Sequence, residues 1–121
     1  MLMQTIKNIP GRVVRAFGYS WDGLKGAFIK EESFRLELMG LLILLAILLV
    51  APWPAWKKAA LLAAYCLIPL TELVNSALED ICDLVSPEIH PLVKAAKDKG
   101  SAAVLLALIF SGLALVALLL F

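Results

Sequence analysis

The last part of the chain, residues 100–121, runs for 22 positions without a charged side chain. A helix of about 20 apolar residues is long enough to cross the hydrocarbon core of a bilayer, so this run predicts a membrane-spanning helix. Composition agrees, because 62% of the 121 residues are hydrophobic, whereas a soluble domain carries roughly 45–50%. A soluble chain of this size could not bury the excess, since its surface is large relative to its volume.

Two further apolar runs, residues 38–51 and 59–71, predict two more spans. The prolines and tryptophans of residues 52–56 predict a tight turn between them, because proline ends a helix and tryptophan favours the membrane interface. The predicted fold is an all-α integral membrane protein whose single domain covers residues 1–121. Its predicted segments are a surface-helix region at 1–33, a first span at 34–52, a second span with a cytoplasmic extension at 55–85, a linker at 86–99 and a third span at 100–121.

The N-terminal segment mixes basic and apolar side chains. From Val14 onward the apolar positions 14, 17, 21, 24 and 28 recur at helical spacing, which predicts an amphipathic helix. A basic amphipathic helix next to a span is typical of a helix that lies on the lipid surface. An ordinary solvated arm is the alternative.

The distribution of lysine and arginine predicts how the chain is oriented. Six of these residues lie within residues 1–35, three in the linker at 86–99 and two in the turn at 52–58. Because cytoplasmic loops carry the excess of positive charge, we expect the N-terminus and the linker on the cytoplasmic side and the C-terminus outside. The formal net charge is only +1, so no strong global field points to nucleic acid as a partner.

The second predicted span carries an unusual set of polar side chains. In a helix that turns about 100° per residue, the positions i, i+3, i+4, i+7 and i+11 fall on one face. This polar stripe consists of Glu72, Asn75, Ser76, Glu79 and Asp83. A carboxylate inside a membrane is costly, so Glu72 indicates a functional site. Asn75 and Ser76 taken alone could equally be interhelical hydrogen-bond partners.

The chemistry of the polar stripe suits a phosphoryl group and a metal. Carboxylate oxygens together with phosphate oxygens are the ligands that Mg²⁺ prefers. A desolvated carboxylate near the interface could also accept a proton from a lipid hydroxyl. Positive charge at the same level, which phosphates need, is available from Lys97 and from His90. By its spacing alone, His90 is as readily a solvated or capping residue.

Other residues could complete the site or build an assembly. Glu31, Glu32 and Glu37 flank the start of the first span, where one of them could add a metal ligand or only pair with nearby cations. No Walker-type phosphate loop occurs in the chain. Small residues in the third span favour close helix packing and so an oligomer; they are Gly100, Ala103, Ala107 and Gly112.

Several motifs together resemble the signature of the small prokaryotic diacylglycerol kinases. The most specific is Glu72-Leu-Val-Asn-Ser-Ala-Leu-Glu79, which Asp83 follows. The others are Gly18-Tyr-Ser-Trp21, Glu31 through Glu37, Glu88-Ile-His90, Ala96-Lys-Asp98 and Gly100-Ser-Ala-Ala-Val104. The resemblance covers about residues 12–104.

This resemblance implies a homotrimer that transfers the γ-phosphate of ATP to a lipid hydroxyl, at active sites shared between subunits on the cytoplasmic face of the bacterial inner membrane. It implies Glu72 as the general base, and Glu31 and Glu79 as ligands of Mg²⁺. The nucleotide contacts that it implies come from Arg12, Tyr19, Glu31, Glu79, Glu88, His90, Lys97 and Asp98. Asn75 and Asp83 would support the site. The lipid would lie against Arg12, Ser20, Trp21, Glu72 and Ser101.

The sequence leaves alternatives open for the acceptor lipid and for the class of function. Residues 90–98 resemble the related undecaprenol kinases, whereas residues 18–21 and 100–104 resemble the diacylglycerol branch, so diacylglycerol is the expected acceptor and phosphatidic acid the product. A small proton-coupled transporter could also use Glu72, but it would not need a cytoplasmic cluster of charged residues around Lys97. A subunit without enzymatic activity is the third class, and it would tolerate neutralisation of the polar stripe.

Overall fold

The computed structural model describes the whole chain, Met1–Phe121, and contains helices but no strands. The helices are α1 (Leu2–Lys7), α2 (Ile9–Lys30), α3 (Glu32–Val50), α4 (Ala55–Val85) and α5 (Pro91–Leu120). They form two compact units, Met1–Glu32 and Ser33–Phe121. Three of them, α3, α4 and α5, are long and apolar enough to cross a membrane. The predicted all-α membrane fold with three spans is therefore confirmed.

The first unit contains α1 and α2, which meet at Asn8. Asn8 ends α1 and precedes α2, and Pro10 lies in the first turn of α2. Proline is tolerated there because the first N–H groups of a helix have no intrahelical acceptor. Neither helix buries a residue within this unit. Large apolar side chains on α2, among them Phe17 and Trp21, are exposed. Exposed apolar side chains are typical of a helix that lies on a lipid surface.

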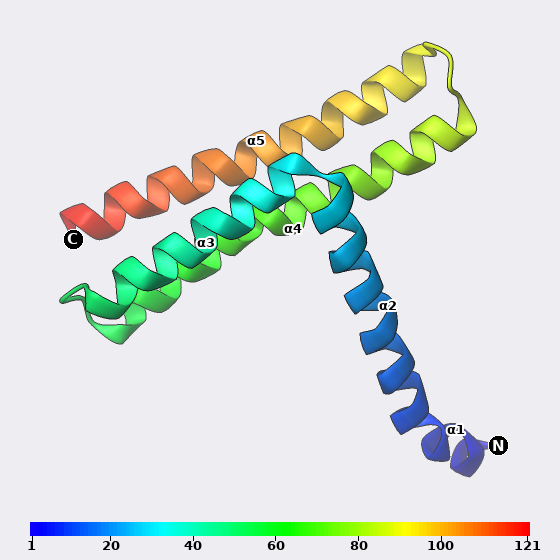
Figure 1. The fold of residues 1–121 in the computed structure, drawn as a ribbon, viewed down its shortest axis with the longest axis horizontal. Helices are drawn as coiled ribbons and strands as arrows, with labels where there is room; N and C mark the ends of the chain where they lie inside the picture. Colours follow the sequence, from blue (N-terminus) through cyan, green and yellow to red (C-terminus); the bar gives the residue numbers. More distant parts are fainter. The chain divides into compact units, whose positions relative to one another are not determined.

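The second unit is built on α4 and α5, which lie side by side and run in opposite directions (Figure 1). Ser111 on α5 donates a buried hydrogen bond of 2.6 Å to the carbonyl oxygen of Ala64 on α4. At the far end of the pair, Lys57 donates to the carbonyl oxygen of Leu118 at 3.1 Å. A lysine near the end of a helix satisfies a carbonyl that has no intrahelical donor. These two bonds tie the helices together at the middle and at the end near Lys57.

A polar contact joins α3 to α4 within the predicted spans. The hydroxyl of Tyr65 donates to the carbonyl oxygen of Glu37 at 2.7 Å. A Cβ atom at Gly40 would collide with the same hydroxyl, so the absence of a side chain at position 40 lets the tyrosine reach the α3 backbone. This contact brings the first turns of α3 against the middle of α4.

Most apolar side chains of the three long helices stay exposed within one chain. The most apolar stretches of α3, α4 and α5 are only 11%, 28% and 11% buried. A soluble protein would not leave so much apolar surface in water, whereas lipid or a second copy of the chain can cover it at no such cost. The core consists of a few residues, led by Phe34, whose side chain is fully buried.

The predicted linker at 86–99 is mostly helical in the structure. The non-helical part is short, because α5 begins at Pro91. His90 Nδ1 accepts a hydrogen bond of 3.1 Å from the backbone N–H of Leu92, and Pro91 occupies the first turn. Both features start a helix, and neither depends on hydrophobicity. The charged residues up to Lys99 therefore extend α5 beyond its uncharged run.

Candidate functional site

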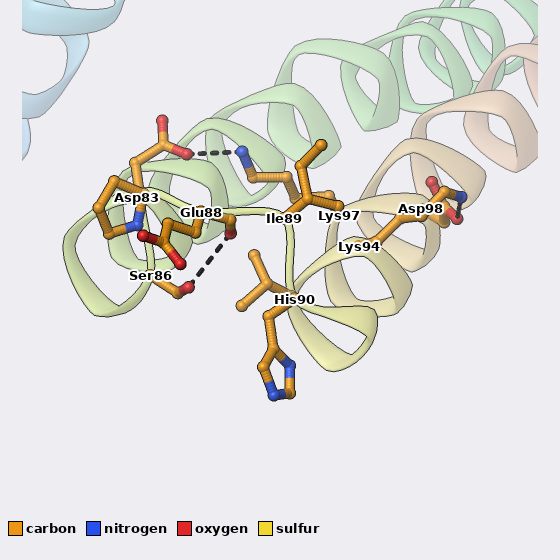
Figure 2. Close-up of a pocket in the computed structure, with 10 residues that line it drawn as sticks. Asp83, Ser86, Glu88, Ile89, His90, Lys94, Lys97 and Asp98 are labelled. Carbon is orange, nitrogen blue, oxygen red and sulfur yellow. Dashed lines mark hydrogen bonds and ion pairs between the residues drawn. The ribbon is translucent and has the colours of Figure 1, made fainter.

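A hollow of about 340 Å³ lies where the end of α4, the connecting loop and the start of α5 meet (Figure 2). Most of the residues around it are polar or charged. They are Asp83, Ser86, Pro87, Glu88, Ile89, His90, Val93, Lys94, Lys97 and Asp98. Five residues predicted at the site from the sequence are therefore brought together here by the fold: Asp83, Glu88, His90, Lys97 and Asp98.

Both lysine side chains of this hollow form ion pairs. Lys97 Nζ lies 2.5 Å from Asp83 Oδ1 and so joins α5 to α4 (Figure 2). Lys97 precedes the uncharged run of α5. Its hydrogen bond to Asp83 raises the pKa of its ammonium group above the ordinary value. Lys94 pairs with Asp98 at 2.6 Å, one turn along the same helix. Both pairs are largely exposed, so they contribute little to stability, but they keep positive charge available for an anion.

The loop between α4 and α5 is held by its own side chains. Ser86 Oγ donates to the carbonyl oxygen of Glu88 at 3.2 Å. His90 Nδ1 caps α5, and Figure 2 shows the ring pointing away from the pair of Asp83 and Lys97. The capping role that the sequence left open for His90 is therefore present in the structure. Its Nε2 atom takes no part in this cap.

The polar stripe runs along α4, which is unbroken over residues 55–85 even though Pro69 lies inside it. Glu72, Ser76 and Glu79 are half-buried, Asn75 is buried, and Asp83 is exposed at the end next to the hollow. Asn75 Nδ2 donates to Glu79 Oε1 at 3.2 Å. The stripe thus leads from the apolar interior of the unit to the polar hollow.

Two buried oxygens along α4 accept no hydrogen bond. One is Asn75 Oδ1 and the other is Glu37 Oε2, from α3. The carboxyl groups of Glu37 and Glu72 are close enough to interact electrostatically. Both groups are carboxyls, so this interaction is repulsive when both are charged.

Glu79 is the residue of the polar stripe whose surroundings fit a metal ligand. No group of three or more His, Cys, Asp or Glu side chains is placed to hold a metal. Mg²⁺, however, takes one or two carboxylates and fills its other positions with water and substrate phosphate. Glu79, whose carboxylate is oriented by Asn75 and lies on the stripe that leads to the hollow, fits such a role.

The remaining predicted residues are divided between the two units. Arg12, Tyr19, Ser20 and Trp21 are exposed on α2, and Glu31, half-buried, follows its last turn. Ser101 is exposed on α5, one residue after Gly100. The structure describes each unit by itself, so these positions add residues to the site only by resemblance.

Sequence reasoning missed two features of this region. Tyr65 binds the backbone beside Glu37, and its one signal was a hydroxyl within an otherwise apolar run. Gly100 is indicated by the sequence as a small packing residue and as the start of a motif, but only the structure places it directly against Asn75. In both cases the contact joins residues more than 20 positions apart, which periodicity alone does not reveal.

Comparisons with known proteins point in one direction. The family model described as prokaryotic diacylglycerol kinase matches residues 18–120. A diacylglycerol kinase of Escherichia coli (strain K12) is 43% identical over 101 residues, which cover 81% of this chain and 80% of the relative. A diacylglycerol kinase of Helicobacter pylori (strain ATCC 700392 / 26695) is 42% identical over 102 residues, which cover 82% and 77%. A third, from Pseudomonas aeruginosa, is 39% identical over 97 residues, which cover 80% and 79%. The matched region includes the whole polar stripe and the hollow.

Proposed function

This chain belongs to the prokaryotic diacylglycerol kinase family and is an ATP-dependent lipid kinase of the membrane, and we propose that its acceptor is diacylglycerol and its product phosphatidic acid. The match of the family model over residues 18–120 carries the proposal. The polar stripe beside a hollow with two cations is an arrangement that such a reaction can use. The comparisons do not favour an undecaprenol kinase or a proton-coupled transporter.

In the proposed reaction, Glu72 is the general base. Its carboxylate takes the proton from the acceptor hydroxyl as the oxygen attacks the γ-phosphorus of ATP. The bond from this phosphorus to the bridging oxygen breaks, and ADP leaves with the bond electrons. Catalysis of phosphoryl transfer consists mainly of positioning and charge neutralisation. The place of Glu72, half-buried on the polar stripe of α4, supports this role.

Glu31 and Glu79 are the proposed ligands of Mg²⁺. The two carboxylates would hold the ion, which would supply positive charge to offset that of the phosphates. Asn75 supports the site because its amide donates to Glu79 and fixes the direction of that carboxylate. Glu31 is assigned by resemblance, from its place directly after the last turn of α2.

The hollow is the proposed nucleotide site. Without nucleotide, the ammonium group of Lys97 pairs with Asp83. When ATP binds, a phosphate takes the place of Asp83 as the partner of Lys97. The further contacts proposed for ATP are Arg12, Tyr19, Glu31, Glu79, Glu88, His90 and Asp98. The proposed lipid contacts are Arg12, Ser20, Trp21, Glu72 and Ser101. The exposed position of the α2 side chains supports this assignment, because a lipid reaches a site from the membrane surface.

The proposed setting is the bacterial inner membrane, with the hollow on the cytoplasmic side and the C-terminus in the periplasm. We also propose a homotrimer with active sites shared between subunits. The exposed apolar faces of the long helices support an assembly. No nucleic acid partner is proposed.

The decisive experiment is an assay of purified Glu72→Gln in lipid micelles with labelled ATP. Phosphorylated lipid should fall by about 10²-fold or more, the typical contribution of a general base, while gel filtration and circular dichroism stay unchanged. Leu70→Val, a change at an exposed apolar position of the same helix, is the matched control and should keep its activity. Near-normal turnover of Glu72→Gln would refute the assignment. Diacylglycerol and undecaprenol offered in parallel identify the acceptor.

A further inference from the structure

Gly100 on α5 lies against the side chain of Asn75 on α4. A Cβ atom at position 100 would collide with Asn75 Oδ1, and it would come within 3.2 Å of Asn75 Cγ and 3.1 Å of Leu78 Cδ2. The hydrogen that glycine carries in this direction instead faces the amide oxygen, as in a weak C–H···O contact. While Asn75 keeps its place, position 100 therefore admits only glycine.

Asn75 lies between α5 and Glu79, with one end of its amide toward each. Asn75 is only 9% exposed, and its oxygen is buried against α5 without an N–H or O–H donor. Its nitrogen donates to Glu79 Oε1 at 3.2 Å. If the amide turned over, an oxygen would face the carboxylate and repel it. The carboxylate therefore fixes the direction of the amide, and the space left by Gly100 lets the oxygen end lie against α5.

We propose that Gly100 is a positioning residue of the kinase, because it lets α5 lie against Asn75 so that the amide orients the Glu79 carboxylate toward the metal–nucleotide complex. This inference rests on the proposed function, in which Glu79 holds Mg²⁺. Gly100 itself touches neither metal nor substrate. Residues that orient a metal ligand typically change metal affinity by about 10- to 100-fold when they are lost.

The chain offers a matched control on the same helix. Gly112 also lies inside α5, but a Cβ atom there would meet nothing within 4 Å. Alanine at either position raises the helix propensity by the same amount. The two substitutions therefore differ in the contact with Asn75 and not in their effect on the backbone of α5.

The test uses the full-length protein in lipid micelles with Mn²⁺ and a non-hydrolysable ATP analogue, and electron paramagnetic resonance follows the bound Mn²⁺. Gly100→Ala should weaken Mn²⁺ binding by about 10- to 100-fold, and Gly112→Ala should bind like the wild type. In kinetic assays the KM for Mg²⁺ should rise more than the KM for lipid. If Gly100→Ala binds Mn²⁺ like Gly112→Ala, the inference is wrong.

A double-mutant cycle separates this role from a merely structural one. If Gly100 acts through Asn75, the variant that combines Gly100→Ala with Asn75→Ala binds Mn²⁺ no more weakly than Asn75→Ala alone. Additive losses would overturn the inference. This comparison also decides the question if Gly100→Ala alone fails to fold, because removing the Asn75 amide removes the collision.

A third variant distinguishes failure of the inference from failure of the proposed function. Glu79→Gln should abolish the same Mn²⁺ signal. If it does so while Gly100→Ala has no effect, only the inference about Gly100 fails. If Glu79→Gln leaves the Mn²⁺ signal intact, the metal assignment and the inference that rests on it both fail.

Discussion

Lys97 shows how one side chain can be held in place without being used for stability. It lies 2.5 Å from Asp83, and the pair bridges the two helices at the edge of the hollow. The pair is exposed to solvent. If it breaks, hydration of the two separated charges offsets most of the lost interaction energy. A phosphate can therefore take Lys97 from Asp83 at little cost. The sequence had already indicated both residues, but only the fold shows that they are partners.

A prediction at this scale is that Lys97→Met raises the KM for ATP by about tenfold or more, because a charge-assisted bond to phosphate is lost. The KM for lipid and the midpoint of thermal unfolding should change little. Lys58→Met, at the opposite end of α4, is the control and should leave the KM for ATP unchanged. Equal KM values for ATP in Lys97→Met and the wild type would remove Lys97 from the nucleotide site.

At the scale of elements, the contact between α3 and α4 depends on one hydroxyl. Tyr65 donates to the carbonyl oxygen of Glu37, and Gly40 leaves the space for it. In lipid, helices gain no hydrophobic energy from packing on each other, so close approach and interhelical hydrogen bonds decide where they meet. Glu37 lies in the turn of α3 that this contact holds against α4.

We expect Tyr65→Phe to lower the free energy of unfolding by about 0.5–1.5 kcal/mol, since a buried carbonyl loses its donor. Unfolding by sodium dodecyl sulfate in mixed micelles measures the change. Gly40→Ala should destabilise the protein as well, because a Cβ atom at position 40 would collide with the Tyr65 hydroxyl. Tyr19→Phe, at an exposed tyrosine of α2, is the control. Unchanged stability in both Tyr65→Phe and Gly40→Ala would mean that this contact does not hold α3.

At the scale of the whole molecule, we expect the charges to differ between the two sides of the membrane. The loop at residues 86–90 and the turn at 51–54 lie at opposite ends of α4. Lys94, Lys97 and Lys99 follow the first along the chain, whereas Lys57 and Lys58 follow the second. Lys57 lies near the rings of Trp53 and Trp56, 5.9 and 5.7 Å from their centroids, as in an interfacial belt.

The orientation can be measured with single cysteines in a chain whose Cys66 and Cys82 are replaced by alanine. A membrane-impermeant maleimide should label Ala55→Cys in intact spheroplasts, because we expect that turn in the periplasm. Ile89→Cys, at an exposed loop residue, should react only after the membrane is opened. The opposite pattern would reverse the proposed orientation, and both variants must stay active for the result to count.

Much of this protein can be deduced from the sequence, because lipid as a solvent imposes simple rules. A span needs only length and apolarity, so residues 100–121 and the two earlier runs determine the class and number of spans. Helical period alone places Glu72, Asn75 and Glu79 on one face. The resemblance of the motifs then indicates a lipid kinase before any coordinates are considered.

The tertiary structure decided which residues touch. The start of α5 at Pro91, the contact of Gly100 with Asn75 and the bond from Tyr65 to Glu37 all depend on local capping or on where two helices cross. The crossing is set by the shapes of side chains far apart in sequence, and hydrophobic periodicity contains no information about them. The polar stripe was therefore readable from the chain, whereas the partners that orient it were not.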